Sequence, residues 1–168
     1  MNLTYSEVGA TRDGPLPPGY LHVTRRVRVG VGAEAFRVAA EALAGWRPQR
    51  GAGLLVRTEA DRPAVGVEFA SGIGVGLLRL WVPCRIVWVI DEPGRYGFGF
   101  GTLPGHVETG EEAFLLSTDF SDDAAGEVWF EVRAFSRPAK WWVRLGAPVA
   151  KLVQARVTDR YAKAMQGL

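Results

Sequence analysis

Hydrophobic and polar residues alternate along much of the chain, with a period of two that is typical of β-strands with one buried face. The first such segment begins at Tyr20 and places four apolar side chains on one face: Leu21, Val23, Val27 and Val29. The other face carries polar side chains: His22, Thr24, Arg26 and Arg28. This pattern predicts a half-buried strand, and we expect His22 to face solvent rather than to serve as a ligand.

The spacing of apolar residues changes to three and four over residues 32–46, which indicates an amphipathic helix directly after the first strand. The apolar positions of its predicted buried face are Phe36, Ala39, Ala40 and Leu43. Gly45 is well placed to end this helix, because glycine readily adopts the backbone conformations that follow a helix.

Strand-like segments then follow one another over residues 53–59, 64–70, 73–82, 84–92, 95–102, 111–119 and 127–135. Turn-forming residues separate them, at Asp61-Arg62-Pro63, Ser71-Gly72, Pro83, Glu92-Pro93-Gly94, Pro104-Gly105, Thr109-Gly110 and Ser121-Asp122-Asp123. Short connections favour antiparallel pairing of successive strands, so we expect a meander. Strands and helices do not alternate here, which disfavours a doubly wound parallel sheet.

The two ends of the chain differ from this middle part. Residues 1–19 are rich in glycine and proline, and predict an extended arm on the surface. Ser136 and Pro138 predict the start of a helix that runs to the C-terminus, with serine as its cap and proline in its first turn. We expect Gly146 and Pro148 to break or kink that helix. Its predicted apolar face comprises Val149, Leu152, Val153, Val157, Tyr161, Ala164 and Met165.

This order of elements predicts an α+β protein in which a curved antiparallel β-sheet wraps around a long C-terminal helix, with one further helix after the first strand. The topology resembles the helix-grip folds of the START-like and pollen-allergen-like superfamily, and this resemblance implies an apolar cavity between sheet and helix. We expect an N-terminal arm over residues 1–19, followed by a single helix-grip-like domain over residues 20–168.

Composition and charge exclude several classes of partner. The chain has 168 residues, of which 48% are hydrophobic and 23% charged, as in ordinary globular domains. A net charge of +2, with no basic block, disfavours nucleic acid as a partner. The single cysteine, Cys84, fits a reducing cytoplasm, and the N-terminus has no pattern of a secretion signal. The longest apolar run, residues 72–90, is interrupted by Arg79, Pro83 and Arg85, so we expect no membrane span.

Three motifs stand close together in the second half of the chain: GTLPGH at 101–106, GEEAF at 110–114 and AFSRP at 134–138. Together they resemble the signature of a bacterial and plant group, the uncharacterised protein family 0548, a domain of unknown function. The resemblance covers nearly the whole chain and implies kinship without an established activity. Where this group carries tyrosine before the first glycine of GTLPGH, the present chain has Phe100, which counts against an essential phenol there.

The densest group of chemically active side chains consists of His106 with Glu108, Glu111 and Glu112. A histidine beside a carboxylate can act as a general base, so His106 and Glu108 are the catalytic candidates. A zinc site needs three or four ligands, and the chain offers two histidines and one cysteine, so we predict neither a metal site nor a cofactor. The alternative is a hairpin loop whose charges are solvated.

Glycines at 97, 99 and 101 alternate with Phe98 and Phe100, and leave one face of a predicted strand without side chains. This stretch matches neither the dinucleotide-binding fingerprint nor a phosphate-binding loop. A bare strip permits another element or a ligand to approach the backbone closely. Packing of a helix against the strip is the favoured interpretation, and contact with a ligand is the alternative.

Two further groups bear on the site and on assembly. Arg85 and Arg133 lie on predicted strands, where buried arginines need carboxylate partners such as Glu111 or Glu112. Such a network could fix the strand register or anchor an acidic group of a ligand.

The adjacent Trp141 and Trp142 cannot both face one spot on a helix, so we expect at least one to be exposed and a homodimer to be possible.

The leading functional hypothesis is a non-catalytic cytoplasmic protein that binds a small apolar or amphipathic molecule between the sheet and the C-terminal helix. The candidate ligand-binding residues are His106, Glu112, Arg133, Phe98, Phe100 and Trp88. One alternative is an enzyme that uses His106 and a glutamate as acid and base in the same pocket. Another is a packed structural or interaction domain without a ligand.

Overall fold

The structure of the chain, a computed structural model, describes residues 2–74, 79–118, 126–139 and 147–168, and the side chains of all of these except 147–154. Within these residues seven strands form one antiparallel sheet in the order β1-β7-β6-β5-β4-β3-β2. The strands are β1 (Leu21–Val31), β2 (Leu55–Arg57), β3 (Glu68–Ile73), β4 (Leu80–Glu92), β5 (Arg95–Thr102), β6 (Glu108–Thr118) and β7 (Glu127–Pro138). The helices are α1 (Gly32–Ala44), α2 (Arg47–Gly51) and α4 (Ala147–Gln166).

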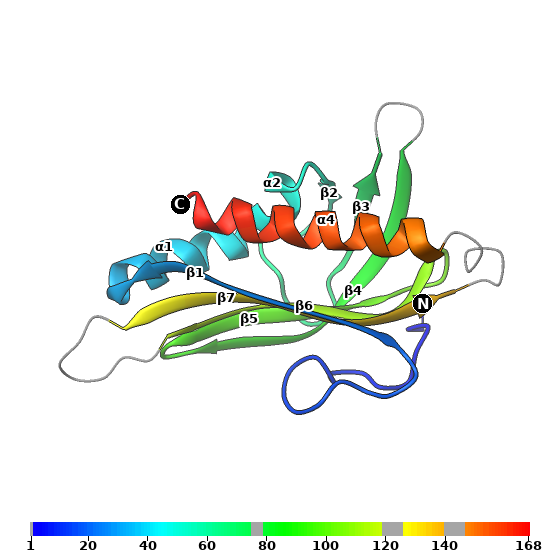
Figure 1. Cartoon of the computed structure of the whole chain (residues 1–168), viewed down its shortest axis with the longest axis horizontal. Helices are drawn as coiled ribbons and strands as arrows, with labels where there is room; N and C mark the ends of the chain where they lie inside the picture. Colours follow the sequence, from blue (N-terminus) through cyan, green and yellow to red (C-terminus); the bar gives the residue numbers. More distant parts are fainter. Residues whose placement is uncertain (1, 75–78, 119–125, 140–146) are drawn as a thin grey trace.

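The sheet is strongly curved, and α4 lies along its concave side (Figure 1). Helices α1 and α2 lie on the same side and both contact α4. The N-terminal segment, residues 2–19, loops against the opposite, convex side of the sheet (Figure 1). The chain thus has the expected architecture, a curved antiparallel sheet that holds a C-terminal helix, with a helix directly after the first strand.

The hydrophobic core lies between the concave face and the helices. Phe98, Phe114 and Phe130 project into it from β5, β6 and β7, and are fully buried. From the helical side, the ring of Trp46 lies 4.8 Å from that of Phe69 and 5.6 Å from that of Phe98. Burying one large apolar side chain contributes about 1.5–3 kcal/mol, so these aromatic contacts hold α2 firmly on the sheet.

The predicted first helix is confirmed. Its apolar positions at Ala39 and Leu43 are buried, while Glu34 and Arg37 form an exposed ion pair one turn apart. The helix ends before Gly45, and the N–H of Gly45 donates to a carbonyl of the last helical turn.

Three of the predicted turns are wrong, because strand pairing continues through them. Pro83 lies inside β4 opposite Ala70, and its carbonyl accepts a hydrogen bond from the N–H of Leu103 at 3.1 Å. The φ angle of proline is compatible with a strand. Proline is therefore tolerated there wherever strand pairing does not need a backbone N–H. The predicted turn at Ser71-Gly72 lies within β3, and the turn at Thr109-Gly110 within β6.

The predicted start of the last helix at Ser136 is also wrong. Ser136 and Pro138 belong to β7, where they pair with Gly110 and Glu108 of β6. The helix begins at Ala147, so Pro148 stands in its first turn, where a missing N–H costs nothing, and does not kink it. Gly146, Trp141 and Trp142 lie outside the described residues, and so does the argument for a homodimer that rests on the two tryptophans.

Candidate functional site

A β-bulge in β4 decides which side chains face which side of the sheet. Ile86 pairs with Phe100, yet Trp88 pairs with Gly99, so Val87 is an extra residue in β4. Directly paired residues of antiparallel strands point to the same face. Ile86 and Phe100 therefore face the concave side, whereas Trp88 joins the glycines on the convex side.

The glycine strip of β5 accommodates two aromatic side chains. A methyl group added to Gly99 would lie 2.2 Å from the indole nitrogen of Trp88, and one added to Gly101 would lie 2.2 Å from the hydroxyl of Tyr5. Trp88 comes from the neighbouring strand and Tyr5 from the N-terminal segment. The interpretation that a helix packs on this strip is therefore wrong.

The same convex face contains a buried carboxylate, that of Glu111, which is 2% exposed. Its Oε2 accepts hydrogen bonds from the Tyr5 hydroxyl at 2.6 Å and the Gly9 N–H at 2.7 Å. Its Oε1 accepts from the N–H of Thr11 at 3.0 Å, from the hydroxyl of Thr11 and from the indole N–H of Trp88 at 3.4 Å. We call this group the Glu111 node; its hydrogen bonds fasten the N-terminal segment to the sheet.

On the concave face, one row of paired residues crosses five strands: Val23, Ala134, Glu112, Phe100 and Ile86. Glu112 is the acidic member of this row and is half-buried. Neighbouring strands lie about 4.8 Å apart, so Glu112 stands about 10 Å from the edge strand β1. The small side chain of Ala134 lies between them.

A second carboxyl, that of Glu108, lies on the same strand and the same face as Glu112. Glu108 and Glu112 are both on the concave face, and Gly110 between them has no side chain to separate them. Loss of hydration on burial, with a smaller contribution from Glu108, raises the pKa of Glu112 to about 8. Burial also raises the pKa of Glu108, while a hydrogen bond with Ser136, opposite Gly110, opposes that rise.

Two more side chains approach Glu112 from other elements. Tyr161 of α4 is 5% exposed, and its ring packs edge-on against Phe114 at 4.9 Å. Burial raises the pKa of Tyr161 well above its usual value, and the nearby Glu112 and Cys84 raise it further. Burial, followed by the proximity of Glu112, likewise raises the pKa of the Cys84 thiol. Cys84 thus lies on the same face of the sheet as Glu112, and Tyr161 packs onto that face from α4.

A groove of about 380 Å³ lies between β1 and α4. Its walls are residues 21–25 of β1 together with Ala155, Thr158 and Asp159 of α4. Arg25 and Asp159 form an exposed ion pair across it, with nitrogen and oxygen 3.4 Å apart. Val23, which lines this groove, belongs to the same row of paired residues as Glu112.

A second groove, of about 890 Å³, lies at the other edge of the sheet. It follows β2 and the segment after it, and includes Phe69, Pro83 and Leu103. Phe69 also belongs to the aromatic core, so this groove borders the interior from the opposite side.

The ring of His106 bonds to backbone rather than to a carboxylate. Its Nδ1 accepts the N–H of Glu108 at 2.9 Å, which requires a neutral ring. Burial lowers the pKa of His106 to about 4, although the backbone of Glu108 opposes this shift. Among the described residues no carboxyl group is hydrogen-bonded to His106, so the expected histidine–glutamate pair is not formed.

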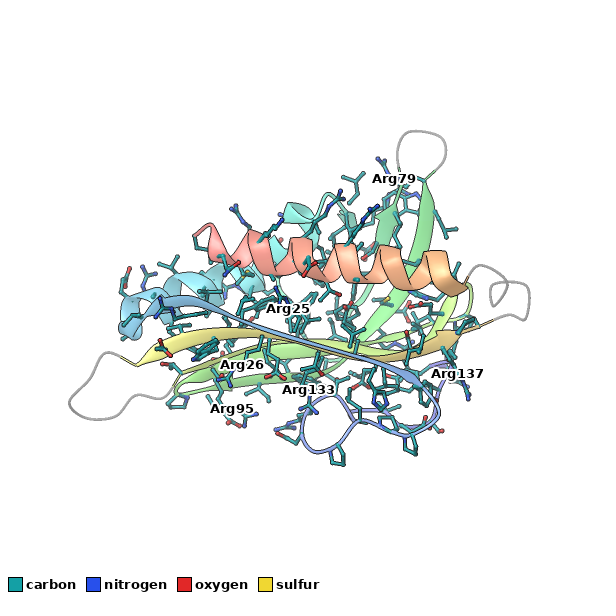
Figure 2. All side chains as sticks on the ribbon, in the orientation of Figure 1. Arg25, Arg26, Arg79, Arg95, Arg133 and Arg137 are labelled. Atoms are coloured by element: carbon teal, nitrogen blue, oxygen red, sulfur yellow. The ribbon has the colours of Figure 1, made fainter. Side chains whose placement is uncertain are left out.

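The partners considered for Arg85 and Arg133 are not the ones found: both arginines lie on the convex face, away from Glu112, and Glu111 is bonded to other donors. Arg133 donates to the carbonyl of Gly14 and lies 3.9 Å from the carboxylate of Glu131. Arg85 pairs with Glu68 at 2.5 Å. Figure 2 shows Arg133 on the side of the N-terminal segment and Arg25 on the side of α4.

The structure thus divides the predicted ligand-binding residues. Glu112, Phe98 and Phe100 share the concave face, with Phe98 fully buried in the core. Trp88 and Arg133 lie on the other face, and His106 lies in the connection between β5 and β6. Ala134, Ser136 and Tyr161 were not among the predicted ligand-binding residues. Of these, only Tyr161 carried a signal, since it stands on the predicted buried face of the last helix.

The described residues include neither a membrane-spanning helix nor a metal-binding cluster. No helix among them combines the length and apolar character needed to cross a membrane. No cluster of three or more histidine, cysteine, aspartate or glutamate side chains among them is arranged to hold a metal ion.

Comparison with known sequences identifies relatives. Residues 4–164 match a family described as a domain of unknown function, DUF1990. A UPF0548 protein of Deinococcus radiodurans is 36% identical, over 95% of this chain and 84% of its own length. A UPF0548 protein of Arabidopsis thaliana is 31% identical, over 88% of this chain and 72% of its own length. One of Dictyostelium discoideum is 32% identical, over 77% of this chain and 63% of its own length.

Comparison with solved structures identifies the fold. The crystal structure of Ara h 8.0201 matches with a TM-score of 0.53 at 14% identity, over 89% of this chain and 97% of that chain. A hypothetical protein of Helicobacter pylori matches with a TM-score of 0.60 at 8% identity, over 89% of both chains. The predicted helix-grip, pollen-allergen-like fold is thereby confirmed.

Proposed function

The chain belongs to the DUF1990 family, and from this premise we propose that it binds a small apolar or amphipathic molecule between the concave face of the sheet and α4. The observation that carries the proposal is the state of Glu112. Its carboxyl is half-buried and deprived of hydration, and no described residue makes a hydrogen bond with it. An acid in such a place lowers the stability of the fold unless a bound molecule supplies its partner.

The surroundings of Glu112 suit an amphipathic molecule. Phe100 stands beside it on β5 and Ala134 on β7, and both present apolar surface. The groove between β1 and α4 is lined in part by Val23, the outer member of the same row of residues. A ligand with an apolar body and one polar group would fill this path and reach Glu112, as is usual for small-molecule sites.

The catalytic alternative has less support. General base catalysis by His106 would require a ring nitrogen free to take a proton and a carboxyl group to orient the ring. The Nδ1 atom is already engaged by the backbone, and the low pKa of His106 makes it a weak base at neutral pH.

Native mass spectrometry of the purified protein, together with titration of the neutral fluorescent probe N-phenyl-1-naphthylamine, tests the proposal. We expect either a co-purifying small molecule or saturable 1:1 binding of the probe. Ala134→Leu should weaken binding at least tenfold, because its larger side chain fills the path to Glu112, whereas Val65→Leu on the exposed surface should not. Absence of both the co-purifying molecule and saturable probe binding would overturn the proposal.

A further inference from the structure

Three side-chain atoms at the start of α2 are buried and have no hydrogen-bond partner. They are the indole nitrogen of Trp46 and the amide nitrogen and oxygen of Gln49, and both side chains are 1% exposed. Within the described residues five buried side-chain atoms lack a partner, so three of the five belong to one turn of the chain. A buried polar atom without a partner costs free energy, so this concentration requires an explanation.

The backbone at the start of α2 brings Trp46 and Gln49 next to each other. The carbonyl of Trp46 accepts the N–H of Arg50 at 3.1 Å, so the first helical turn starts at Trp46. Residues three apart on such a turn are neighbours, with Cβ atoms about 5–6 Å apart. Trp46 has a φ of 62° and is the one non-glycine residue with positive φ in the described part of the chain. A bulky residue in this left-handed region is strained, and such strain is concentrated at functional positions of proteins.

The contacts that Trp46 and Gln49 make within the protein do not use the three atoms. The ring of Trp46 packs against Phe69 and Phe98, for which another aromatic ring would also serve. The main-chain carbonyl of Gln49 accepts the N–H of Leu54 at 3.0 Å, and any residue could do the same. The indole N–H and the side-chain amide are therefore left for a group that no described residue supplies.

The surroundings of Trp46 favour a neutral group. Phe69, whose ring lies 4.8 Å from that of Trp46, also lines the groove of about 890 Å³, so Trp46 contacts a wall residue of that groove. Trp46 belongs to the hydrophobic core, and the charged residues of α2, Arg47 and Arg50, are exposed. A charged group bound at Trp46 would lose its hydration without a counter-ion from α2.

We propose that the interior beside α2 binds a carboxamide or lactam group of a small molecule. The carbonyl of such a group accepts hydrogen bonds from the indole N–H of Trp46 and the amide N–H of Gln49, and its own N–H donates to the Gln49 oxygen. A carboxylate has no donor for that oxygen, and an ammonium has no acceptor for the two N–H groups. The rest of the molecule would extend past Phe69 toward the larger groove. The inference goes beyond the proposed function, since it depends on neither Glu112 nor the groove between β1 and α4.

Titration of the isotope-labelled full-length protein with benzamide, benzoate and benzylamine, followed by NMR, tests this site. The three compounds share one ring and differ in the charge of the polar group. We expect benzamide to move the indole N–H signal of Trp46 downfield in a saturable manner, and to bind at least about tenfold more tightly than either charged compound. The signal of Trp46 is identified by its loss in Trp46→Phe.

Gln49→Met keeps the length of the side chain and removes its polar atoms. We expect this variant to bind benzamide at least about tenfold more weakly. Its urea unfolding midpoint should be unchanged or raised, because apolar replacement of an unpaired buried amide removes a desolvation cost. Gln166→Met, a control at the exposed end of α4, should change neither quantity.

The contrary outcomes would each overturn the proposal. An indole signal of Trp46 that benzamide does not move, or equal binding of benzamide and benzoate, would exclude an amide site. Equal binding of benzamide to Gln49→Met and to the original protein would place the compound elsewhere. Loss of stability in Gln49→Met would mean that its amide is already paired inside the protein, by a water molecule only.

Discussion

At the scale of single residues, Glu112 gives the stability of the protein an unusual dependence on pH. Unfolded glutamate has a pKa of about 4.3, whereas folding raises that of Glu112 to about 8. Between these values the folded chain holds a proton that the unfolded chain has lost. The contribution of Glu112 to the free energy of unfolding therefore falls as pH rises through this window, at up to about 1.4 kcal/mol per pH unit.

Glu112→Gln keeps the shape of the side chain and removes this dependence. We expect the variant to gain stability relative to the original protein as pH rises from 5.5 to 8.5, measured by urea unfolding at several pH values. The titration of His106 is common to both proteins and cancels in the difference. Parallel curves over the whole range would contradict the raised pKa of Glu112.

Gly99 is constrained by the side chain that covers it. Any Cβ there would overlap the indole of Trp88, which itself is held by the Glu111 node. We expect Gly99→Val to destabilise the fold by about 3 kcal/mol, the upper end of the range of about 1–3 kcal/mol that overpacking of a core commonly costs. Thermal unfolding measures the effect. Gly167→Ala, whose Cβ meets only ordinary contacts, should unfold like the original protein, and equal stability of both variants would refute this account.

At the scale of elements, the N-terminal segment is fastened by few but strong contacts. Glu111 is buried without a described cationic partner, so its charge depends on the donors that surround it. Tyr5→Phe removes one of these donors and leaves the carboxylate less well satisfied. We expect a loss of about 1–3 kcal/mol in the free energy of unfolding.

Tyr20→Phe is the matched control for this experiment. It also removes a tyrosine hydroxyl that donates to a glutamate, but its partner Glu7 is more accessible to water. Its cost should stay below about 1 kcal/mol, as urea unfolding would measure. Equal losses in the two variants would mean that burial of Glu111 adds nothing to the bond from Tyr5.

Sequence patterns predicted some of the helices and strands correctly and others wrongly. The period of two placed Phe98 and Phe100 together on a buried face, and the helical period identified α1 and the buried position of Tyr161. The turn predicted at Pro83 and the helix start predicted at Ser136 were both wrong, because pairing with neighbouring strands outweighed these local preferences. Such pairing is decided by residues far away in the sequence.

The site was less predictable than the fold for a related reason. Trp88 was predicted to bind the ligand, and unbroken alternation along β4 would place it beside Ile86 on the concave face. The extra residue Val87 reverses the faces from that point on, and no local pattern marks it. The neighbours of Glu112 were hidden in the same way, since Ala134 and Ser136 reach it only through the register between β6 and β7.

At the scale of the whole molecule, the ion pair between Arg25 and Asp159 connects the edge of the sheet to α4 across the groove. Both side chains are about half exposed, so the pair should add less than about 1 kcal/mol to stability. If the groove is the path of the ligand, Arg25→Ala should leave urea unfolding nearly unchanged and should speed release of a bound probe severalfold. Stopped-flow dilution measures that rate. Arg28→Ala, which breaks an ion pair away from the groove, should leave it unaltered, and equal rates in both variants would exclude this path.

The Glu111 node has a consequence for how the protein is made. Its hydrogen bonds to the N-terminal segment join residues 100 to 106 positions apart, and the N-terminal partners are synthesised first. At roughly 5–20 residues per second, the ribosome needs on the order of 5–20 s to proceed from Tyr5 to Glu111. Throughout that interval the first residues of the nascent chain have no carboxylate to dock on. Attachment of the N-terminal segment is therefore a late event of biosynthesis, which can take place only once β6 has emerged.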